Sequence, residues 1–169
     1  MKKKVLAISF IIIFAFAVVL LIVAGNRPAI LPLGSDLPNI EYSDSATVKT
    51  VTADSLKNIL IIFFKKECPH CEYELELLNN NTDKIKNVKL YLLTTEKDIF
   101  TSGFTNKFSA LKKLPYTTFG IVNKEEYKNK FGVMVTPALY FFNKAGKLTA
   151  KLKGETKLER ILKELKNEK

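Results

Sequence analysis

An apolar stretch of strand length runs almost directly into two closely spaced cysteines, and this junction constrains the fold more than any other feature. Residues 59–64 read Ile-Leu-Ile-Ile-Phe-Phe, which suits a central strand covered on both faces. Residues 68–71 read Cys-Pro-His-Cys, and a helical pattern begins there that places on one face Cys71, Glu74, Leu75 and Leu78. We therefore expect a buried strand, a short loop and a helix whose first turn carries both cysteines.

The rest of the chain alternates strand and helix patterns, which predicts an α/β fold. Thr156 and Glu159 form a capping box before the last helix, and Asn123 with Glu126 resembles another. Apolar strands need helices on both faces of a mixed sheet to hide them. Further strands are expected at 49–52, 88–93, 117–122, 138–142 and 148–152, and helices near 104–111, 124–131 and 158–165.

The N-terminal segment is interpreted as a membrane-targeting segment. Three lysines precede Val5–Ala24, a 20-residue run interrupted only by Ser9. A helix of ~20 residues matches the ~30 Å hydrocarbon thickness of a bilayer, whereas the apolar part of a cleaved signal peptide is usually about 7–15 residues long. We expect a transmembrane helix with its lysines in the cytoplasm, and keep a cleaved export signal as the alternative. Either way, the following domain is expected in the periplasm or on the outer side of the cell membrane.

The chain then divides into three segments. Residues 1–25 are the anchor or signal, residues 26–47 an extended linker, and residues 48–169 the folded domain. The linker is expected because half of the six prolines gather there beside Gly34 and Ser35.

Charge and residue counts exclude several classes of protein. The chain has 27 Lys and Arg residues against 17 Asp and Glu residues, a formal charge of +10. Only two of these residues, Arg27 and Arg160, have a planar guanidinium group that can bind a phosphate through two hydrogen bonds. We therefore expect a solvated lysine-rich surface and no nucleic-acid partner. With two cysteines and one histidine, a disulfide framework and a multi-histidine site are excluded, and a zinc site is disfavoured because the chain offers no second pair of ligands. We expect no metal and no cofactor.

The cysteine pair at a helix start predicts thiol–disulfide chemistry. A thiolate there faces the positive end of the helix dipole and free N–H groups, which lower its pKa and make it reactive. Cys68, at the open end, is therefore expected to attack, and Cys71, one turn inside, to resolve. Pro69 suits the first helical position, where its missing N–H had no partner. The alternative is a structural disulfide, disfavoured because so short a loop constrains the unfolded chain little.

Two other side chains near the cysteines are candidates for roles in exchange. A protonated His70 would add positive charge beside the Cys68 thiolate. Glu74 lies on the apolar face of the helix, so burial should raise its pKa, and it could pass a proton to or from Cys71. The alternative is that Glu74 is simply a favourable acid near the helix N-terminus, as expected for Glu72.

These residues together resemble the thioredoxin-like superfamily, and more closely its membrane-anchored TlpA/ResA-type thiol-disulfide oxidoreductases. The resemblance covers about Val48–Lys166 and rests on residues 68–74, a long insertion, and the segment 127–147 around Thr136-Pro137. It implies a three-layer sandwich, a cis peptide before Pro137 that faces the cysteines, and a buried glutamate at position 74. Thr136 and Pro137 are thereby implied in substrate binding.

The resemblance also implies the activity. It suggests an extracytoplasmic enzyme that exchanges disulfides with protein substrates through a mixed disulfide at Cys68, and that is served by an upstream redox partner. Two alternatives stay open. The Pro-His dipeptide is also typical of periplasmic oxidases that donate disulfides, and the fold can serve as a non-enzymatic binding adaptor. Glu67 departs from the family, whose members usually carry Trp there.

Overall fold

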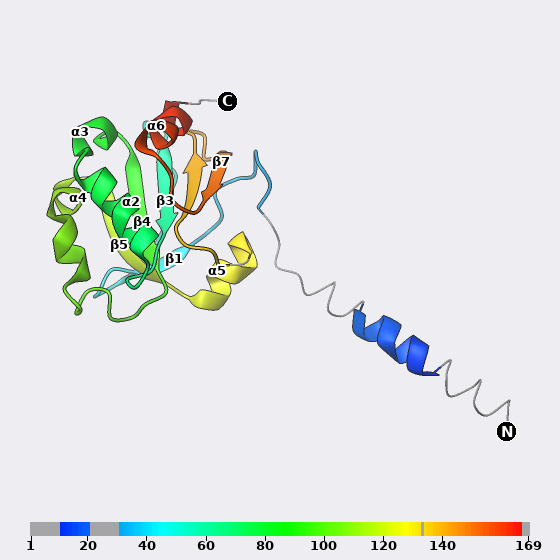
Figure 1. The fold of residues 1–169 in the computed structure, drawn as a ribbon. Coiled ribbons are helices and arrows are strands. Elements are labelled where there is room, and N and C mark those ends of the chain that lie inside the picture. Colours follow the sequence, from blue (N-terminus) through cyan, green and yellow to red (C-terminus); the bar gives the residue numbers. More distant parts are fainter. Residues whose placement is uncertain (1–10, 21–30, 133, 167–169) are drawn as a thin grey trace, which may run out of the picture.

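A seven-stranded mixed sheet forms the centre of the folded part of the molecule, in a computed structural model that describes residues 11–20, 31–132 and 134–166 (Figure 1). The spatial order of the strands is β2-β1-β5-β4-β3-β6-β7. The predicted strand at 59–64 is β3 (Ile59–Phe63), and all five of its residues are buried. It pairs in parallel with β4 (Lys89–Thr94) and antiparallel with β6 (Ala138–Phe142). The outer strands are β1 (Glu41–Ser43), β2 (Val48–Thr50), β5 (Thr117–Val122) and β7 (Leu148–Lys153).

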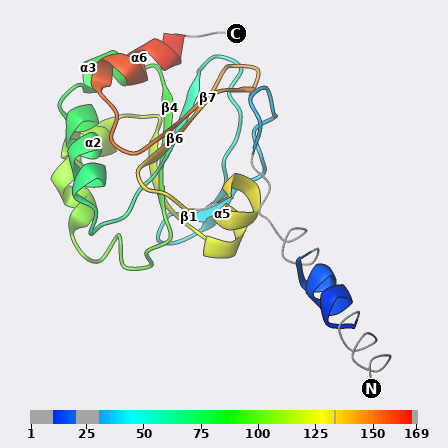
Figure 2. The same cartoon turned by 45° about the vertical axis from the view of Figure 1, so that its right-hand side comes forward.

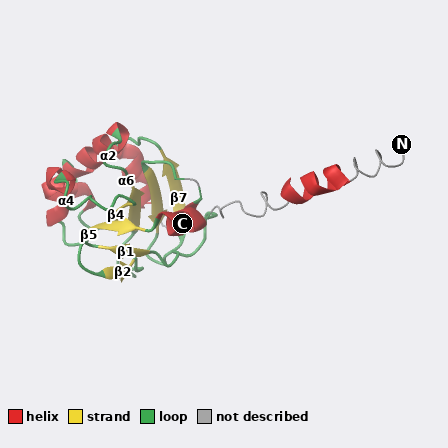
Figure 3. Ribbon diagram, turned by 90° about the horizontal axis from the view of Figure 1, so that it is seen from below, coloured by secondary structure: helices red, strands yellow, loops and turns green. Residues whose placement is uncertain are grey.

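Helices cover both faces of this sheet, as the apolar strands require. On one face lie α2 (Pro69–Asn79), α4 (Ser109–Lys113) and α6 (Leu158–Lys166), as Figures 2 and 3 show. The short α3 (Thr82–Ile85) and the 3₁₀ segment η1 (Phe104–Phe108) add to that layer. On the other face lies α5 (Lys124–Phe131). The predicted α/β class, with a mixed sheet between helices, is confirmed.

Alternate residues of β3 build the two halves of the core. Leu60 and Ile62 belong to the cluster under α2 and α6, whereas Ile59 and Ile61 belong to the cluster on the α5 side. This division follows from the period of two along a strand, which sends successive side chains to opposite faces. Because β3 is buried on both faces, its C-terminal end fixes the position at which the chain enters α2.

The polar helix α5 is held by its two aromatic residues. Tyr127 and Phe131, one turn apart, pack against Phe63 with ring centroids 4.3 and 4.9 Å away. Asn123 caps the helix, as predicted, by accepting from the backbone N–H groups of residues 125 and 126. A helix this short draws its stability from such packing rather than from propensity.

Part of the predicted linker 26–47 belongs to the sheet as strand β1. β1 pairs antiparallel with β5, and the side chains of Ile40 and Tyr42 are only 1% and 6% exposed. Gly120 makes this approach feasible, because a Cβ at that position would lie 2.6 Å from the Tyr42 ring. The pattern did not reveal β1, since the strand has three residues and follows a segment rich in proline and glycine.

Half of the predicted membrane segment, Val5–Ala24, falls outside the described residues. Of that run the structure describes residues 11–20, which are helical. Among the helices of the described ranges, none combines the length and the apolar character needed to cross a bilayer.

The capping box predicted for the last helix does not form, although the helix starts where it was predicted. Thr156 does not cap it; instead its hydroxyl donates to the carbonyl oxygen of Gly154 at 3.2 Å, and α6 starts at Leu158. The predicted apolar stripe of this helix is nevertheless buried at Leu158, Ile161 and Leu165.

Candidate active site at the start of α2

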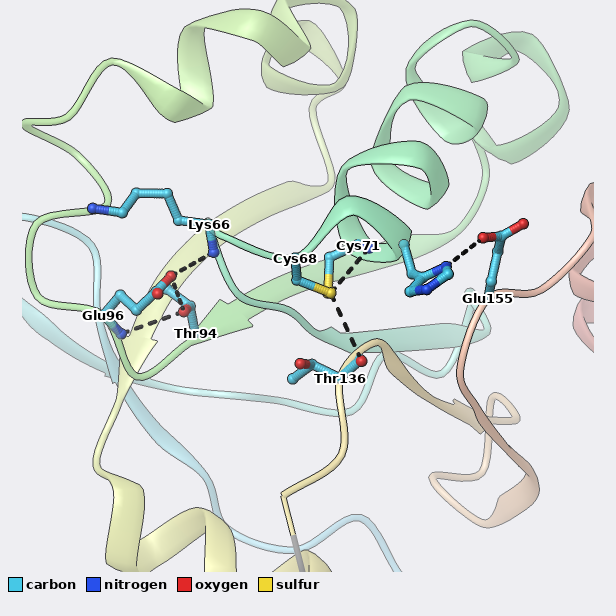
Figure 4. The surroundings of a disulfide bond; sticks show 8 residues. Lys66, Cys68, Cys71, Thr94, Glu96, Thr136 and Glu155 are labelled. Atoms are coloured by element: carbon cyan, nitrogen blue, oxygen red, sulfur yellow. Dashed lines mark hydrogen bonds and ion pairs between the residues drawn. A yellow bond between two sulfur atoms is a disulfide. The ribbon is translucent and has the colours of Figure 1, made fainter.

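The loop between β3 and α2 places both cysteines at the first turn of the helix (Figure 4). Cys68 is the N-cap residue, with an extended backbone, and its Sγ accepts from the Cys71 backbone N–H at 3.2 Å. Pro69 follows in the first turn, where its missing N–H leaves no donor unsatisfied. The two cysteines form a disulfide with their Cα atoms 5.2 Å apart. The predicted junction of strand, loop and helix is confirmed.

The two sulfur-bearing residues differ in how accessible they are. Cys68 is partly exposed, whereas Cys71 has no exposed surface and belongs to the core cluster beneath α2. A macromolecule can therefore approach Cys68 but not Cys71. This asymmetry agrees with the roles predicted for them, attack by Cys68 and resolution by Cys71, and those roles stay predictions.

The loop before Cys68 is anchored by an acid that the sequence did not single out. The Glu96 carboxylate accepts from the Lys66 backbone N–H at 2.6 Å, and Thr94 connects to the same carboxylate at 3.4 Å (Figure 4). The Lys66 ammonium in turn pairs with Asp98. Glu96 follows β4, the parallel neighbour of β3, so the carboxyl ends of both strands meet at this edge. That parallel pairing was the signal which could have found it.

The segment before β6 faces the cysteines from the opposite side of the site. The Thr136–Pro137 peptide bond is cis, and Cys68 Sγ lies 3.8 Å from the Thr136 carbonyl oxygen. Both features were implied by the resemblance, and both are present. Because β6 pairs antiparallel with β3, the start of β6 necessarily lies beside the end of β3. Thr136 and Pro137 are thus brought to the cysteines, and their role in substrate binding stays a prediction.

Glu74 lies on the buried side of α2, one turn beyond Cys71. Its side chain has no exposed surface, and neither carboxylate oxygen has a hydrogen-bond partner among the described residues. Burial raises the pKa of Glu74 to about 8, and the negative charge of Glu155 contributes to the same rise. The predicted burial and the direction of the pKa shift are confirmed, and Glu74 holds its proton at neutral pH.

His70 points to a second acid on the outer surface. Its Nδ1 lies 2.7 Å from Glu155 Oε2, and the two side chains are 69% and 44% exposed. Glu155 belongs to the loop between β7 and α6, and 85 positions separate it from His70. Local patterns carry no signal for a pair so distant in the chain, so sequence reasoning missed Glu155.

The site thus gathers every residue predicted for it, from two separate stretches of chain. Cys68, Cys71, His70 and Glu74 come from α2 and its cap, and Thr136 and Pro137 come from the loop before β6. Within the described ranges, no three His, Cys, Asp or Glu side chains converge to hold a metal ion. What the arrangement can do chemically is to make and break one disulfide at the protein surface.

Several solved structures have a similar fold. A peroxiredoxin-like protein from Aquifex aeolicus aligns with a TM-score of 0.67 at 16% identity, covering 83% of this chain and 89% of that one. The thioredoxin domain of a thiol-disulfide oxidoreductase from Bacteroides vulgatus aligns at 0.61 and 21% identity, covering 80% and 99%. StoA from Bacillus subtilis aligns at 0.53 and 16%, covering 81% and 98%. At these identities the likeness concerns the fold.

The sequence itself assigns the chain to a family. A comparison with curated proteins gives no significant match. The family model described as a thioredoxin-like domain, however, matches residues 45–169, most of the 169-residue chain and all of the site. The resemblance inferred from the cysteine motif and the proline segment is thereby confirmed: the chain belongs to the thioredoxin-like domain family.

Proposed function

We propose that this protein is an extracytoplasmic thiol-disulfide oxidoreductase that acts on protein substrates through the Cys68–Cys71 pair. One observation carries the proposal. A partly exposed cysteine at a helix N-terminus is disulfide-bonded to a buried one and faces a cis proline segment. Both the chemistry of the reactive thiol and the access of a large substrate depend on that arrangement.

The proposed reaction transfers two electrons from the cysteine pair to a substrate disulfide. In the reduced protein the Cys68 thiolate attacks one sulfur of a substrate disulfide, and the other substrate sulfur leaves and takes up a proton. Cys71 then loses its proton and attacks the Cys68 sulfur of the mixed disulfide. The second substrate thiol is released, and the protein is left with its Cys68–Cys71 disulfide. Two electrons have passed to the substrate, and an upstream dithiol must return two to the protein.

The first step benefits from the start of α2. The Cys71 backbone N–H already points at Cys68 Sγ from 3.2 Å, and the end of the helix dipole adds partial positive charge there. Both favour a thiolate at Cys68, because the N–H group and the dipole interact more strongly with an anion than with a neutral sulfur.

The second step needs a proton acceptor where water is excluded. Cys71 is fully buried, and Glu74 is the carboxyl group one turn away on the same buried face. With its pKa raised to about 8, Glu74 is closer to a thiol in acidity than an ordinary glutamate, which suits exchange of a proton with Cys71. We assign Glu74 this proton-transfer role.

Turnover separates the enzyme from a binding adaptor built on the same fold. The full-length protein should catalyse reduction of insulin disulfides by a dithiol, and the Cys68→Ser variant should not. Tyr73→Leu, an exposed change on the same helix, serves as the control for handling and folding. Absence of turnover in the wild-type protein would favour the adaptor.

The direction of electron flow follows from the reduction potential of the pair. Cys-Pro-His-Cys on its own also suits an oxidase, and about 30 mV corresponds to a tenfold change in the exchange equilibrium. Equilibration with glutathione gives the value. A strongly reducing pair supports a reductase, and a strongly oxidising pair supports the disulfide-donating alternative.

The extracytoplasmic site of action is proposed from the sequence. An apolar run of 20 residues after three lysines is long enough for a membrane anchor. Membrane fractionation and protease accessibility from the outer side test it. Full-length protein found free in the cytosol would contradict the proposal, and a processed exported form would replace the anchor by a cleaved signal.

A further inference from the structure

The loop between β7 and α6 supplies an acid to the outer edge of the site. Glu155 Oε2 lies 2.7 Å from His70 Nδ1, and this ion pair joins the cysteine motif to a part of the chain 85 positions away. Figure 4 shows Glu155 reaching toward α2 from the side opposite Glu96 and Lys66. Nothing in the exchange reaction outlined above uses this contact.

The backbone fixes Glu155 relative to the rest of the site. The Gly154 N–H donates to the Pro137 carbonyl oxygen at 2.8 Å, and the Thr156 hydroxyl donates to the Gly154 carbonyl oxygen at 3.2 Å. Gly154 has a φ of +81°, which a residue with a side chain rarely adopts. The turn that carries Glu155 is therefore hydrogen-bonded to the cis proline segment. That segment faces Cys68 from the side opposite α2, the helix that carries His70.

We propose that Glu155 is a positioning residue for His70. By binding the imidazole it withholds that ring's positive charge from the Cys68 thiolate, and so makes the cysteine pair a stronger reductant than the Cys-Pro-His-Cys motif alone implies. This role rests on the proposed function, and its effect is to lower the reduction potential of the cysteine pair.

A positive charge on the imidazole acts on the reduced state of the cysteine pair. A free imidazolium beside Cys68 would stabilise the thiolate, whereas the disulfide carries no charge to stabilise. The free imidazolium would therefore favour the reduced form and raise the reduction potential of the cysteine pair. An imidazolium paired with a carboxylate has no net charge, and its effect on the sulfur is correspondingly weaker. The charge of Glu155 does reach the site, because it contributes to the raised pKa of Glu74.

The expected effect of Glu155 on the reduction potential is modest, because the side chains of His70 and Glu155 are both largely exposed. Surface ion pairs are screened by water, so removal of Glu155's charge should change the equilibrium constant with glutathione by about two- to fivefold. A fivefold change is a rise in potential of about 20 mV.

The experiment is a double-mutant cycle on the full-length protein. The equilibrium constant for reduction by glutathione is measured for the wild type, Glu155→Gln, His70→Leu and the double variant. Glu159→Gln is the matched control, since it makes the same chemical change at an exposed position four residues further on. We expect Glu155→Gln to favour the reduced form by two- to fivefold, Glu159→Gln to leave the constant unchanged, and Glu155→Gln to have little effect once His70 is Leu.

Two outcomes would overturn the role of Glu155. An unchanged constant in Glu155→Gln would show that the ion pair does not affect the sulfur. An equal change with and without His70 would show that the carboxylate acts on the sulfur directly, and not through the imidazole. A wild-type pair that never exchanges with glutathione is a different result, because it would sink the proposed function and this role together.

Discussion

Two carboxylates flank the cysteine pair, and their surroundings could hardly differ more. Glu74 is fully buried beneath α2 beside Cys71, without a hydrogen-bond partner among the described residues, and its pKa rises to about 8. Glu155 lies at the surface on the side of Cys68 and forms an ion pair with His70. We refer to Cys71 and Glu74 as the inner side of the site, and to Cys68, His70 and Glu155 as its outer side.

The comparison shows that burial, not residue type, decides what a carboxyl group can do here. On the inner side the loss of hydration keeps the group protonated, which prepares it for proton exchange with a buried thiol. On the outer side water screens the charge, so the carboxylate can only adjust the potential by a small factor. Large effects of mutation are therefore expected on the inner side and at the cysteines, and small effects at the outer acid and base.

The cysteines should show the largest difference between the two sides. Cys68→Ser should abolish turnover, because the accessible nucleophile is lost. Cys71→Ser should retain the first step and accumulate covalent mixed disulfides with substrates, because no buried thiol resolves them. Non-reducing electrophoresis of each variant after incubation with a disulfide substrate measures this. Trapping by Cys68→Ser and none by Cys71→Ser would reverse the assignment of inner and outer roles.

Glu74 should make stability fall as pH rises. The folded state keeps a proton on Glu74 up to about pH 8, whereas the unfolded chain releases it near pH 4.5, the ordinary pKa of a glutamate. The folded state thus binds the extra proton between these values, and the free energy of unfolding decreases through that window. Glu74→Gln cannot ionise, so it should match the wild type near pH 4 and exceed its stability by roughly 3 kcal/mol at pH 7.

Denaturant unfolding of the oxidised protein at a series of pH values provides the measurement. Glu76→Gln is the control, since Glu76 is exposed on the same helix and should leave the pH dependence as it is. A Glu74→Gln variant whose advantage does not grow between pH 4.5 and 8 would show that the inner carboxyl group is hydrated.

The loop before Cys68 also has one partly buried and one exposed acid, and we expect effects on stability smaller than that of Glu74. Glu96→Ala removes the acceptor of the Lys66 N–H in a partly buried position, and should cost about 1–3 kcal/mol of unfolding free energy. Asp98→Ala removes only the exposed partner of the Lys66 ammonium, and should cost clearly less than Glu96→Ala because water screens an exposed pair. Thermal or denaturant unfolding of the two variants compares them. Equal losses would mean that Glu96 does not anchor the loop.

Much of the inner side could be predicted from the sequence, because its signals are local. The apolar run of β3, the cysteine spacing and the helical face that carries Glu74 are all read within twenty consecutive residues. Burial of Glu74 followed from its place on that face, and the structure places it there.

The parts of the site that come from distant stretches of the chain could not be predicted in the same way. Glu96 and Glu155 follow β4 and β7, and the pairing of these strands within the sheet brings them to the site. Neither glutamate lies in a sequence motif that marks it as a site residue. The cis bond before Pro137 came from the resemblance alone, since spacing cannot show an isomer. β1 was overlooked because three residues are too few for a periodic signal, and only its partner β5 defines it.

The smallest expected effect is at His70, where the outer side can be tested directly. His70→Leu removes an imidazole that, when protonated, stabilises the Cys68 thiolate but not the disulfide, so the reduced form should become less favoured and the potential should fall. Because Glu155 already pairs with the imidazole, we expect only about a two- to threefold decrease in the equilibrium constant with glutathione. Tyr73→Leu introduces the same residue at an exposed, uncharged position of α2 and should leave the constant unchanged. An unchanged or higher potential in His70→Leu would show that the imidazole does not act on the sulfur, and the oxidase alternative would then lose its main support.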